Sequence, residues 1–221
     1  MLPYTLHITR KAVKNINLRI KRDRAIAVSA PLAMSDEAIH SWIASKEKWI
    51  QRTLSDMPEM IPFSYTDGER HSLLGKPVTL QIQNDVPEGI NETGATLCID
   101  ASVPPEKRAA LFASFYARRL NSILEALIDA WVPVMGVSPS SIAIRPTISQ
   151  WGSCNVRTKR LSFSLDLAAK PISLIEAVVV HELCHLLERK HSPRFYHLVN
   201  TCLPDYKEKI KALASFPREF W

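Results

Sequence analysis

Alternating and helical hydrophobic patterns predict a β-rich first half of the chain. The segment INLRI (16–20) alternates apolar and polar residues, which is typical of a half-buried strand. After a short charged turn, AIAVSAP (25–31) is the predicted return strand of a hairpin. Over residues 36–54 apolar positions recur at spacings of three, four and seven. This spacing predicts one amphipathic helix, with Ser35 or Asp36 as its N-cap.

The pattern continues with strands and then changes to helices. KPVTLQIQ (76–83) alternates, and ATLCID (95–100) is a candidate partner strand. Residues 104–131 carry apolar side chains at helical spacing and predict a long helix. Beyond this helix, residues 141–148 and 160–167 predict two strands of a hairpin.

A second helix is apolar on nearly every side. LIEAVVVHELCHLL (174–187) has few polar positions, so we expect this helix to be buried. Ser173 and Glu176 match the S-x-x-E capping box, which predicts that the helix begins at Ser173. We therefore expect an α+β fold with two parts. Residues 1–103 form a β-rich N-terminal part with one helix, and residues 104–221 form a helical domain with an antiparallel hairpin beside the buried helix.

The composition is that of an ordinary globular protein, with 46% hydrophobic and 23% charged residues in 221. No apolar run reaches the roughly 18 residues that a transmembrane helix needs, so we expect no association with a membrane. The first 15 residues lack the apolar core and the cleavage site of a signal peptide. The four cysteines form no C-x-x-C pair. These features predict a cytoplasmic protein with reduced thiols.

Positive charge is concentrated near the N-terminus. The chain has a net charge of +6, and residues 1–24 alone carry seven Lys or Arg against one Asp, which is 7 − 1 = +6. The basic residues of segment 10–24 could bind nucleic acid or a nucleotide. The alternative is that they form the solvated face of the predicted hairpin.

His181, Glu182 and His185 form the motif H-E-x-x-H within the buried helix. Residues i and i+4 of a helix lie about 40° apart around its axis, so both imidazoles can reach one Zn²⁺. Glu182 lies about 100° from His181, a direction that suits a general base acting on water at the metal. Burying unpaired ionisable groups is costly, so these three groups need a shared partner. The sequence therefore predicts a zinc site, the alternative being two hydrogen-bonded core histidines.

His191 is the predicted third zinc ligand. On a continuous helix it would lie about 9 Å beyond His185 and about 120° away, too far to share the metal. Ser192 is a good N-cap and Pro193 a good first helical residue. One helix should therefore end by His191 and another begin at Pro193, so that His191 lies at a corner and can turn back to the zinc. The alternative is a side chain stabilised by the dipole at a helix C-terminus.

Other side chains compete for a role at the site. Alternative third ligands are three acidic residues further along the chain: Glu188, Asp205 and Glu208. His197 is expected to be solvated or to cap a helix. Cys184 is expected to be a small buried hydrophobe, and Cys154 is a weaker candidate for a nucleophile. Candidates for stabilising the charge of a transition state are Arg194, Tyr196 and Tyr206.

These motifs resemble a known family, the YgjP-like metallopeptidases, which are zincins. The resemblance extends over nearly the whole chain and is carried by INLRI, AVSAP, K-x-K-W-I (46–50), WGSC (151–154), VVVHELCHL (178–186), HSPRFYHLV (191–199) and LPDYK (203–207). It implies an α+β fold whose second part is a zincin-like catalytic domain. It also implies a zinc-dependent hydrolase with His181, His185 and His191 as ligands and Glu182 as the catalyst. In metzincins a glycine makes the turn before the third histidine, whereas this chain has Glu188 at that position.

The segment WGSC precedes the buried helix with the H-E-x-x-H motif, the predicted metal helix, by one strand. An edge strand beside such a site can pair with an extended substrate. We therefore expect Trp151, Gly152 and Ser153 to lie near the zinc and to bind substrate, with Gly152 allowing close approach of the backbone. Arg194 is a further candidate for substrate binding. The alternative places Trp151 in the core and the other residues in a hairpin turn.

The favoured function is a zinc-dependent metallopeptidase in which Glu182 activates a water molecule at the metal. One alternative is a metal-dependent nucleoside triphosphate hydrolase, although the sequence has no P-loop. Another is a nucleic-acid-associated protease that docks through residues 10–24. A binding module with a structural metal is disfavoured, because structural zinc sites usually take all four ligands from protein. The sequence predicts neither the substrate nor the oligomeric state.

Overall fold

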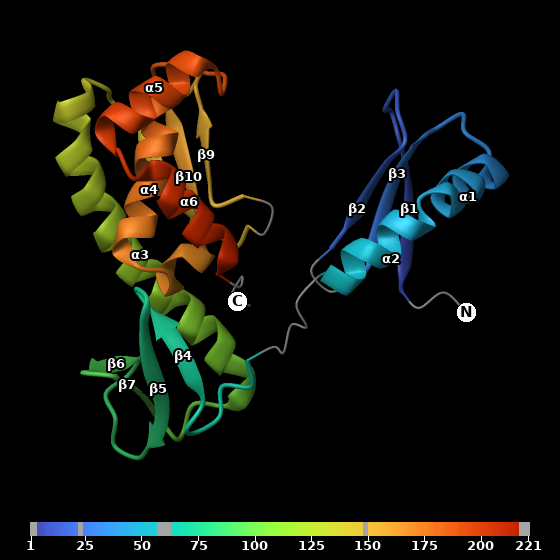
Figure 1. Cartoon of the computed structure of the whole chain (residues 1–221). Helices are drawn as coiled ribbons and strands as arrows, with labels where there is room; N and C mark the ends of the chain where they lie inside the picture. Colours follow the sequence, from blue (N-terminus) through green and yellow to red (C-terminus); the bar gives the residue numbers. More distant parts are fainter. Residues whose placement is uncertain (1–3, 22–23, 57–62, 148–149, 217–221) are drawn as a thin grey trace. The chain divides into compact units, whose positions relative to one another are not determined.

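The computed structural model describes residues 4–21, 24–56, 63–147 and 150–216, and it divides the chain into two compact units (Figure 1). Unit 1 is Met1–Pro62 and unit 2 is Phe63–Trp221. This division differs from the boundary between residues 103 and 104 that the sequence suggested. The strands of residues 70–100 share a hydrophobic core with the long helix that follows them, so they belong to unit 2.

Unit 1 is a three-stranded sheet with two helices. The strand order is β1-β3-β2, with β3 parallel to β1 and antiparallel to β2, so the predicted hairpin is the β2–β3 pair. Its elements are β1 (Leu6–Lys11), β2 (Asn17–Ile20), β3 (Ile26–Pro31), α1 (Asp36–Ser45) and α2 (Glu47–Asp56). Ser35 caps α1 by accepting a hydrogen bond from Ala38 N. The single helix expected over residues 36–54 is instead two helices, because α1 ends at Ser45 and Lys46 separates it from α2.

Unit 2 begins with a four-stranded sheet of order β4-β5-β7-β6. Its strands are β4 (Arg70–Leu73), β5 (Lys76–Gln83), β6 (Asn91–Thr93) and β7 (Thr96–Asp100). The β4–β5 turn docks on the segment that leads into the metal helix, since Leu74 N donates to Ala168 O (2.7 Å). Gly75, at φ +79°, lies so close to Pro171 that a Cβ would come within 2.7 Å of its ring. The first sheet of unit 2 therefore supports the start of the metal helix.

Helix α3 (Pro105–Met135) joins the two halves of unit 2. It extends beyond the predicted end at residue 131 and stops where Gly136 adopts a left-handed conformation at φ +63°. Its buried face packs against the first sheet and against the metal helix; it consists of Phe112, Phe115, Tyr116, Leu120, Leu124 and Ile128. No helix among the described residues is both long and apolar enough to span a membrane.

The second sheet of unit 2 lies beside the metal helix. It consists of β8 (Ser141–Arg145), β9 (Gly152–Asn155) and β10 (Arg160–Ser164) in the order β8-β10-β9. The remaining elements are a 3-10 turn η1 (Leu165–Ala169), α4 (Ile172–Cys184), α5 (Pro193–Cys202) and α6 (Tyr206–Ser215). The hairpin is β9–β10, whereas β8 pairs with β10 in parallel, so the expectation of a hairpin between 141–148 and 160–167 was wrong. The fold class, α+β with a β-rich N-terminal part, is confirmed.

Candidate metal centre and catalytic cleft

Helix α4 carries His181 and Glu182 through the core of unit 2, as the sequence predicted. His185 is the residue that caps its C-terminus, so the helix ends before the expected residue 187. It begins at Ile172 after Pro171, one residue before the expected start, and no side chain caps it. The predicted capping box does not form, because Glu176 accepts hydrogen bonds from Trp131 Nε1 (3.2 Å) and Lys209 Nζ (3.3 Å). Glu176 thus ties α4 to α3 and α6 and fixes the metal helix against both neighbours.

The chain turns sharply between α4 and α5 without glycine. Helix α4 ends at Cys184, and Glu188 N still donates to Cys184 O (2.9 Å). Ser192 then caps α5 by accepting a hydrogen bond from Phe195 N (3.2 Å), and Pro193 is the first helical residue. The predicted helix break is confirmed. Every residue from 185 to 193 is described, and none has a positive φ, so ordinary backbone conformations make the corner.

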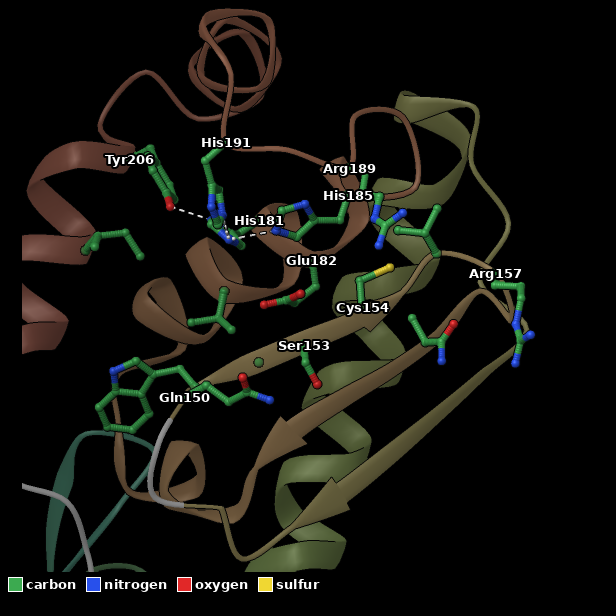
Figure 2. Close-up of a pocket in the computed structure, with 16 residues that line it drawn as sticks. Gln150, Ser153, Cys154, Arg157, His181, Glu182, His185, Arg189, His191 and Tyr206 are labelled. Atoms are coloured by element: carbon green, nitrogen blue, oxygen red, sulfur yellow. Dashed lines mark hydrogen bonds between the residues drawn. The ribbon is translucent and has the colours of Figure 1, made fainter. Parts of the chain in front are cut away.

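The corner brings the three histidines together (Figure 2). His181 Nε2 lies 3.2 Å from His185 Nε2 and 3.0 Å from His191 Nε2. Three nitrogens bound to one tetrahedral Zn²⁺ at about 2.0–2.1 Å would be about 3.3 Å apart, which is close to these two distances. Among the described residues, this trio is the one group of three or more potential ligands close enough to share a metal. The rival acidic ligands lie outside it.

The outer nitrogens of two histidines are held by neighbours. His181 Nδ1 lies 2.6 Å from Tyr206 Oη, and His185 Nδ1 lies 3.2 Å from Glu188 O. Such contacts fix the ring orientation and leave Nε2 free for a metal. Burial, reinforced by the other two histidines, lowers the pKa of His181 to about 4, and burial also lowers the pKa of His185. Both rings are therefore neutral near pH 7, which is the form that binds metal.

Glu182 is buried between α4 and strand β9. Its side chain fills the space that a side chain at Gly152 would need, since a Cβ there would lie 2.6 Å from Glu182 Oε1. Burial raises the pKa of this carboxyl to about 8. Among the described residues, Glu182 Oε2 is buried and has no hydrogen-bond partner. A buried carboxyl group with an oxygen that has no partner, one residue from a potential metal ligand, suits a group that handles a proton of water.

A cleft of about 1180 Å³ opens over these groups. The predicted substrate-binding residues Trp151, Gly152 and Ser153 line it, but Arg194 is exposed on α5 and does not. Sequence reasoning missed four further polar lining residues: Gln150, Asn155, Arg157 and Arg189. Arg157 and Arg189 could have been found from the sequence, because each is a basic residue close to a segment already assigned to the site: Arg157 follows WGSC and Arg189 follows H-E-x-x-H.

The cysteines near the site are not activated. Burial raises the pKa of Cys154 to about 11, with a smaller contribution from Glu182, and burial raises the pKa of Cys184 to about 12. Neither thiol would be ionised near pH 7, so neither has the thiolate character of a nucleophile. Cys184 packs in an apolar cluster with Phe195 and Val199, as expected of a small buried hydrophobe. All four cysteines are free.

A buried helix with two histidines and a glutamate, a third histidine from the following corner and an edge strand across a cleft define a metal-dependent hydrolase. The model of the family described as YgjP-like, metallopeptidase domain, matches residues 14–216. The chain therefore belongs to the YgjP-like metallopeptidase family, and the family resemblance noted in the sequence is confirmed. It is a metallopeptidase, and its family implies a divalent metal.

The chain is also similar to two solved structures. The metallopeptidase zymogen of Pyrococcus abyssi abylysin is 18% identical, with a TM-score of 0.39 over 44% of this chain and 99% of that one. The metallopeptidase zymogen of Methanocaldococcus jannaschii jannalysin is 19% identical, with a TM-score of 0.35 over 41% of this chain and 88% of that one. No curated protein matches the sequence.

Proposed function

We propose that this metallopeptidase binds zinc through His181, His185 and His191 and hydrolyses peptide bonds with Glu182 as general base. The observation that supports the proposal most strongly is the convergence of the three Nε2 atoms beside a buried carboxylate oxygen without a partner. Neutral imidazoles favour zinc, whereas Mg²⁺ and Ca²⁺ prefer oxygen ligands. Three protein ligands leave the fourth position of a tetrahedral site for water or substrate, which is the pattern of catalytic zinc.

When bound, zinc would polarise the substrate carbonyl and make a nearby water more acidic. Glu182 Oε2 would accept the proton of the attacking water and then deliver it to the leaving amine nitrogen. The close contact with Gly152 limits the positions that the Glu182 side chain can take while it carries this proton. Tyr206 would hold the His181 ring in place during the reaction through its contact with Nδ1.

Strand β9 is an edge strand, since the sheet order β8-β10-β9 leaves one of its sides without a partner strand among the described residues. An extended peptide could pair with this edge and lie along the cleft, with its reacting carbonyl near Glu182. Trp151, Gly152 and Ser153 would then contact the substrate backbone. This arrangement supports a peptide as the substrate.

The alternatives from the sequence receive no support. Family membership does not favour a nucleoside triphosphate hydrolase. In the basic segment 10–24, Arg10 contacts Asp36 (2.5 Å) and Arg24 donates to Leu54 O (2.9 Å), so part of its charge is used within unit 1. Arg22 lies outside the described residues. Nucleic-acid binding and a cytoplasmic location stay predictions, the latter being compatible with the four free cysteines.

Metal analysis together with turnover tests the proposal. Wild type should bind about one zinc per chain and cleave casein-derived peptides in preference to nucleoside triphosphates. His191→Ala should weaken zinc binding, because two histidines from one helix remain. Glu182→Gln should keep its zinc but lower kcat by about 10²- to 10⁴-fold. Full zinc affinity in His191→Ala, or normal kcat in Glu182→Gln, would contradict the proposal.

A further inference from the structure

The end of the cleft beyond His185 carries unpaired positive charge. Arg157 comes from the β9–β10 turn and Arg189 from the loop after α4, and both line the cleft. In Figure 2 they lie on the opposite side of the histidines from Tyr206. The carboxylate among the lining residues is Glu182, which is buried at the centre of the site. At this end of the cleft, the described lining residues therefore present two guanidinium groups and no exposed carboxylate to a substrate.

Within the described residues no hydrogen bond or ion pair engages these two guanidinium groups, in contrast to those of Arg108 and Arg119. Arg108 donates to Tyr65 O (3.0 Å) and to Val103 O (3.1 Å), and Arg119 forms an ion pair with Glu92 (3.0 Å). The guanidinium groups of Arg108 and Arg119 are thus tied to specific acceptors. The two arginines of the cleft have their donors free for a ligand.

The surroundings reinforce this charge. The β9–β10 turn and the loop after α4 contribute two further exposed basic residues, Lys159 and Lys190. The acidic residue in these two segments, Glu188, accepts a hydrogen bond from Lys190 N (3.2 Å) and is half-buried. The local potential at this end of the cleft is therefore positive, which attracts anionic groups and repels cationic ones.

We propose that Arg157 and Arg189 select peptides with acidic side chains, an inference that rests on the proposed peptidase function. Strand β9 runs from Gly152, which contacts Glu182, towards Arg157. A substrate paired antiparallel to β9, the more stable ladder, runs in the opposite direction. The residues on the N-terminal side of the cleaved bond then lie beside the two arginines. Asp or Glu at those positions can accept the charged hydrogen bonds that the guanidinium groups offer.

Three matched peptides test this preference with the zinc-loaded full chain. They share one sequence and differ at the second and third residues before the cleaved bond, which are both Glu, both Gln or both Lys. We expect kcat/KM to fall in that order, with about tenfold between Glu and Gln, because two partly exposed ion pairs contribute modestly. Raising the salt concentration should reduce the ratio, since salt screens exposed charges.

The double variant Arg157→Glu/Arg189→Glu should invert the order, so that the Lys peptide becomes the best substrate. The control Lys107→Glu/Arg118→Glu changes the net charge equally on the exposed surface of α3 and should keep the wild-type order. Zinc content measured for each variant shows whether the metal site is intact.

The outcomes separate the two proposals. If zinc-loaded wild type cleaves none of the peptides, the peptidase function itself fails. If it cleaves all three equally well, the selection of acidic side chains fails and the peptidase function stands. A preference for Glu that survives the double reversal, or that arises only when Glu follows the cleaved bond, overturns the assignment of Arg157 and Arg189.

Discussion

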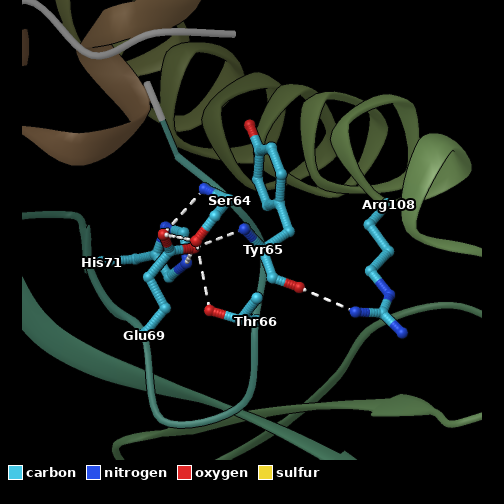
Figure 3. A network of polar contacts seen from close by, with 6 residues as sticks. All are labelled: Ser64, Tyr65, Thr66, Glu69, His71 and Arg108. Atoms are coloured by element: carbon cyan, nitrogen blue, oxygen red, sulfur yellow. Dashed lines mark hydrogen bonds and ion pairs between the residues drawn. The ribbon is translucent and has the colours of Figure 1, made fainter. Parts of the chain in front are cut away.

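Two groupings of glutamate and histidine lie in unit 2, and they differ in how their polar atoms are used. In the first, the Glu69 carboxylate accepts hydrogen bonds from Ser64 N (2.8 Å), Ser64 Oγ (2.9 Å) and Tyr65 N (2.7 Å) (Figure 3). His71 Nε2 lies 3.2 Å from the same carboxylate, and the ring of Phe112 packs on His71 with centroids 4.9 Å apart. The partners of this carboxylate come from the segment just before β4 and from β4 itself.

The second grouping is the candidate metal centre. The Nε2 atoms of His185 and His191 both approach that of His181, although three imidazole nitrogens directed at one point offer one another few complementary hydrogen bonds. Glu182 Oε2 has no partner among the described residues. Both groupings place a carboxyl group beside a histidine, yet only the second leaves acceptor atoms directed at a shared point. Unsatisfied acceptors that converge, rather than buried polar residues as such, therefore indicate the functional site.

The largest of the effects predicted here is for a substitution at Gly152, where strand β9 contacts Glu182 of α4. In Gly152→Ala the new Cβ would lie 2.6 Å from Glu182 Oε1, and the carboxylate must move. A displacement of about 1 Å in a reacting group can reduce turnover about 100-fold. We expect kcat for a peptide substrate to fall by that order while zinc affinity, measured by competition with a chelator, changes little.

A double-mutant cycle shows whether the effect acts through Glu182. In a Glu182→Ala background the side chain that collides with the new methyl group is absent, so Gly152→Ala should cause little further loss of activity. If the two losses simply add, the alanine acts on something other than the position of the general base, such as pairing of the substrate with β9.

The next effect concerns the contact between Tyr206 Oη and His181 Nδ1 (2.6 Å). Tyr206→Phe removes the partner that orients this ring, and loss of such a partner weakens metal affinity about 10- to 100-fold. Zinc affinity should fall by this amount, as measured by chelator competition. Tyr196→Phe removes a hydroxyl from exposed Tyr196 on α5 and serves as the matched control, with unchanged zinc affinity. Equal affinities for the two variants would show that Tyr206 does not support the site.

Local features of the sequence predicted much of this site, because they depend on neighbouring residues. The i, i+4 spacing aligned His181 with His185, and the cap and proline at Ser192 and Pro193 ended one helix and began another. The approach of His191 to His181 followed from these local rules.

Features that join distant segments were not predictable in the same way. The capping box failed because Trp131 and Lys209 reach Glu176 from other helices. The role of Gly152 was foreseen only as close backbone approach, because its contact with Glu182 depends on how β9 packs against α4. The parallel pairing of β8 with β10 likewise depends on how the chain passes through β9 before β10 pairs with β8. The alternation of apolar and polar residues does not show this path.

The smallest of these effects should come from the first grouping, that of Glu69 and His71. It should appear in stability rather than in activity. Glu69→Gln replaces one acceptor oxygen by an NH₂ group, which cannot accept the bonds from Ser64 or Tyr65. We expect the free energy of unfolding, measured with urea, to fall by about 1–3 kcal/mol. Zinc affinity and kcat should remain at wild-type values. Glu88→Gln makes the same change at an exposed carboxylate and should leave stability nearly unchanged. If Glu69→Gln instead lowered kcat without lowering stability, the first grouping would also belong to the functional site, and unsatisfied acceptors would not be what separates the two.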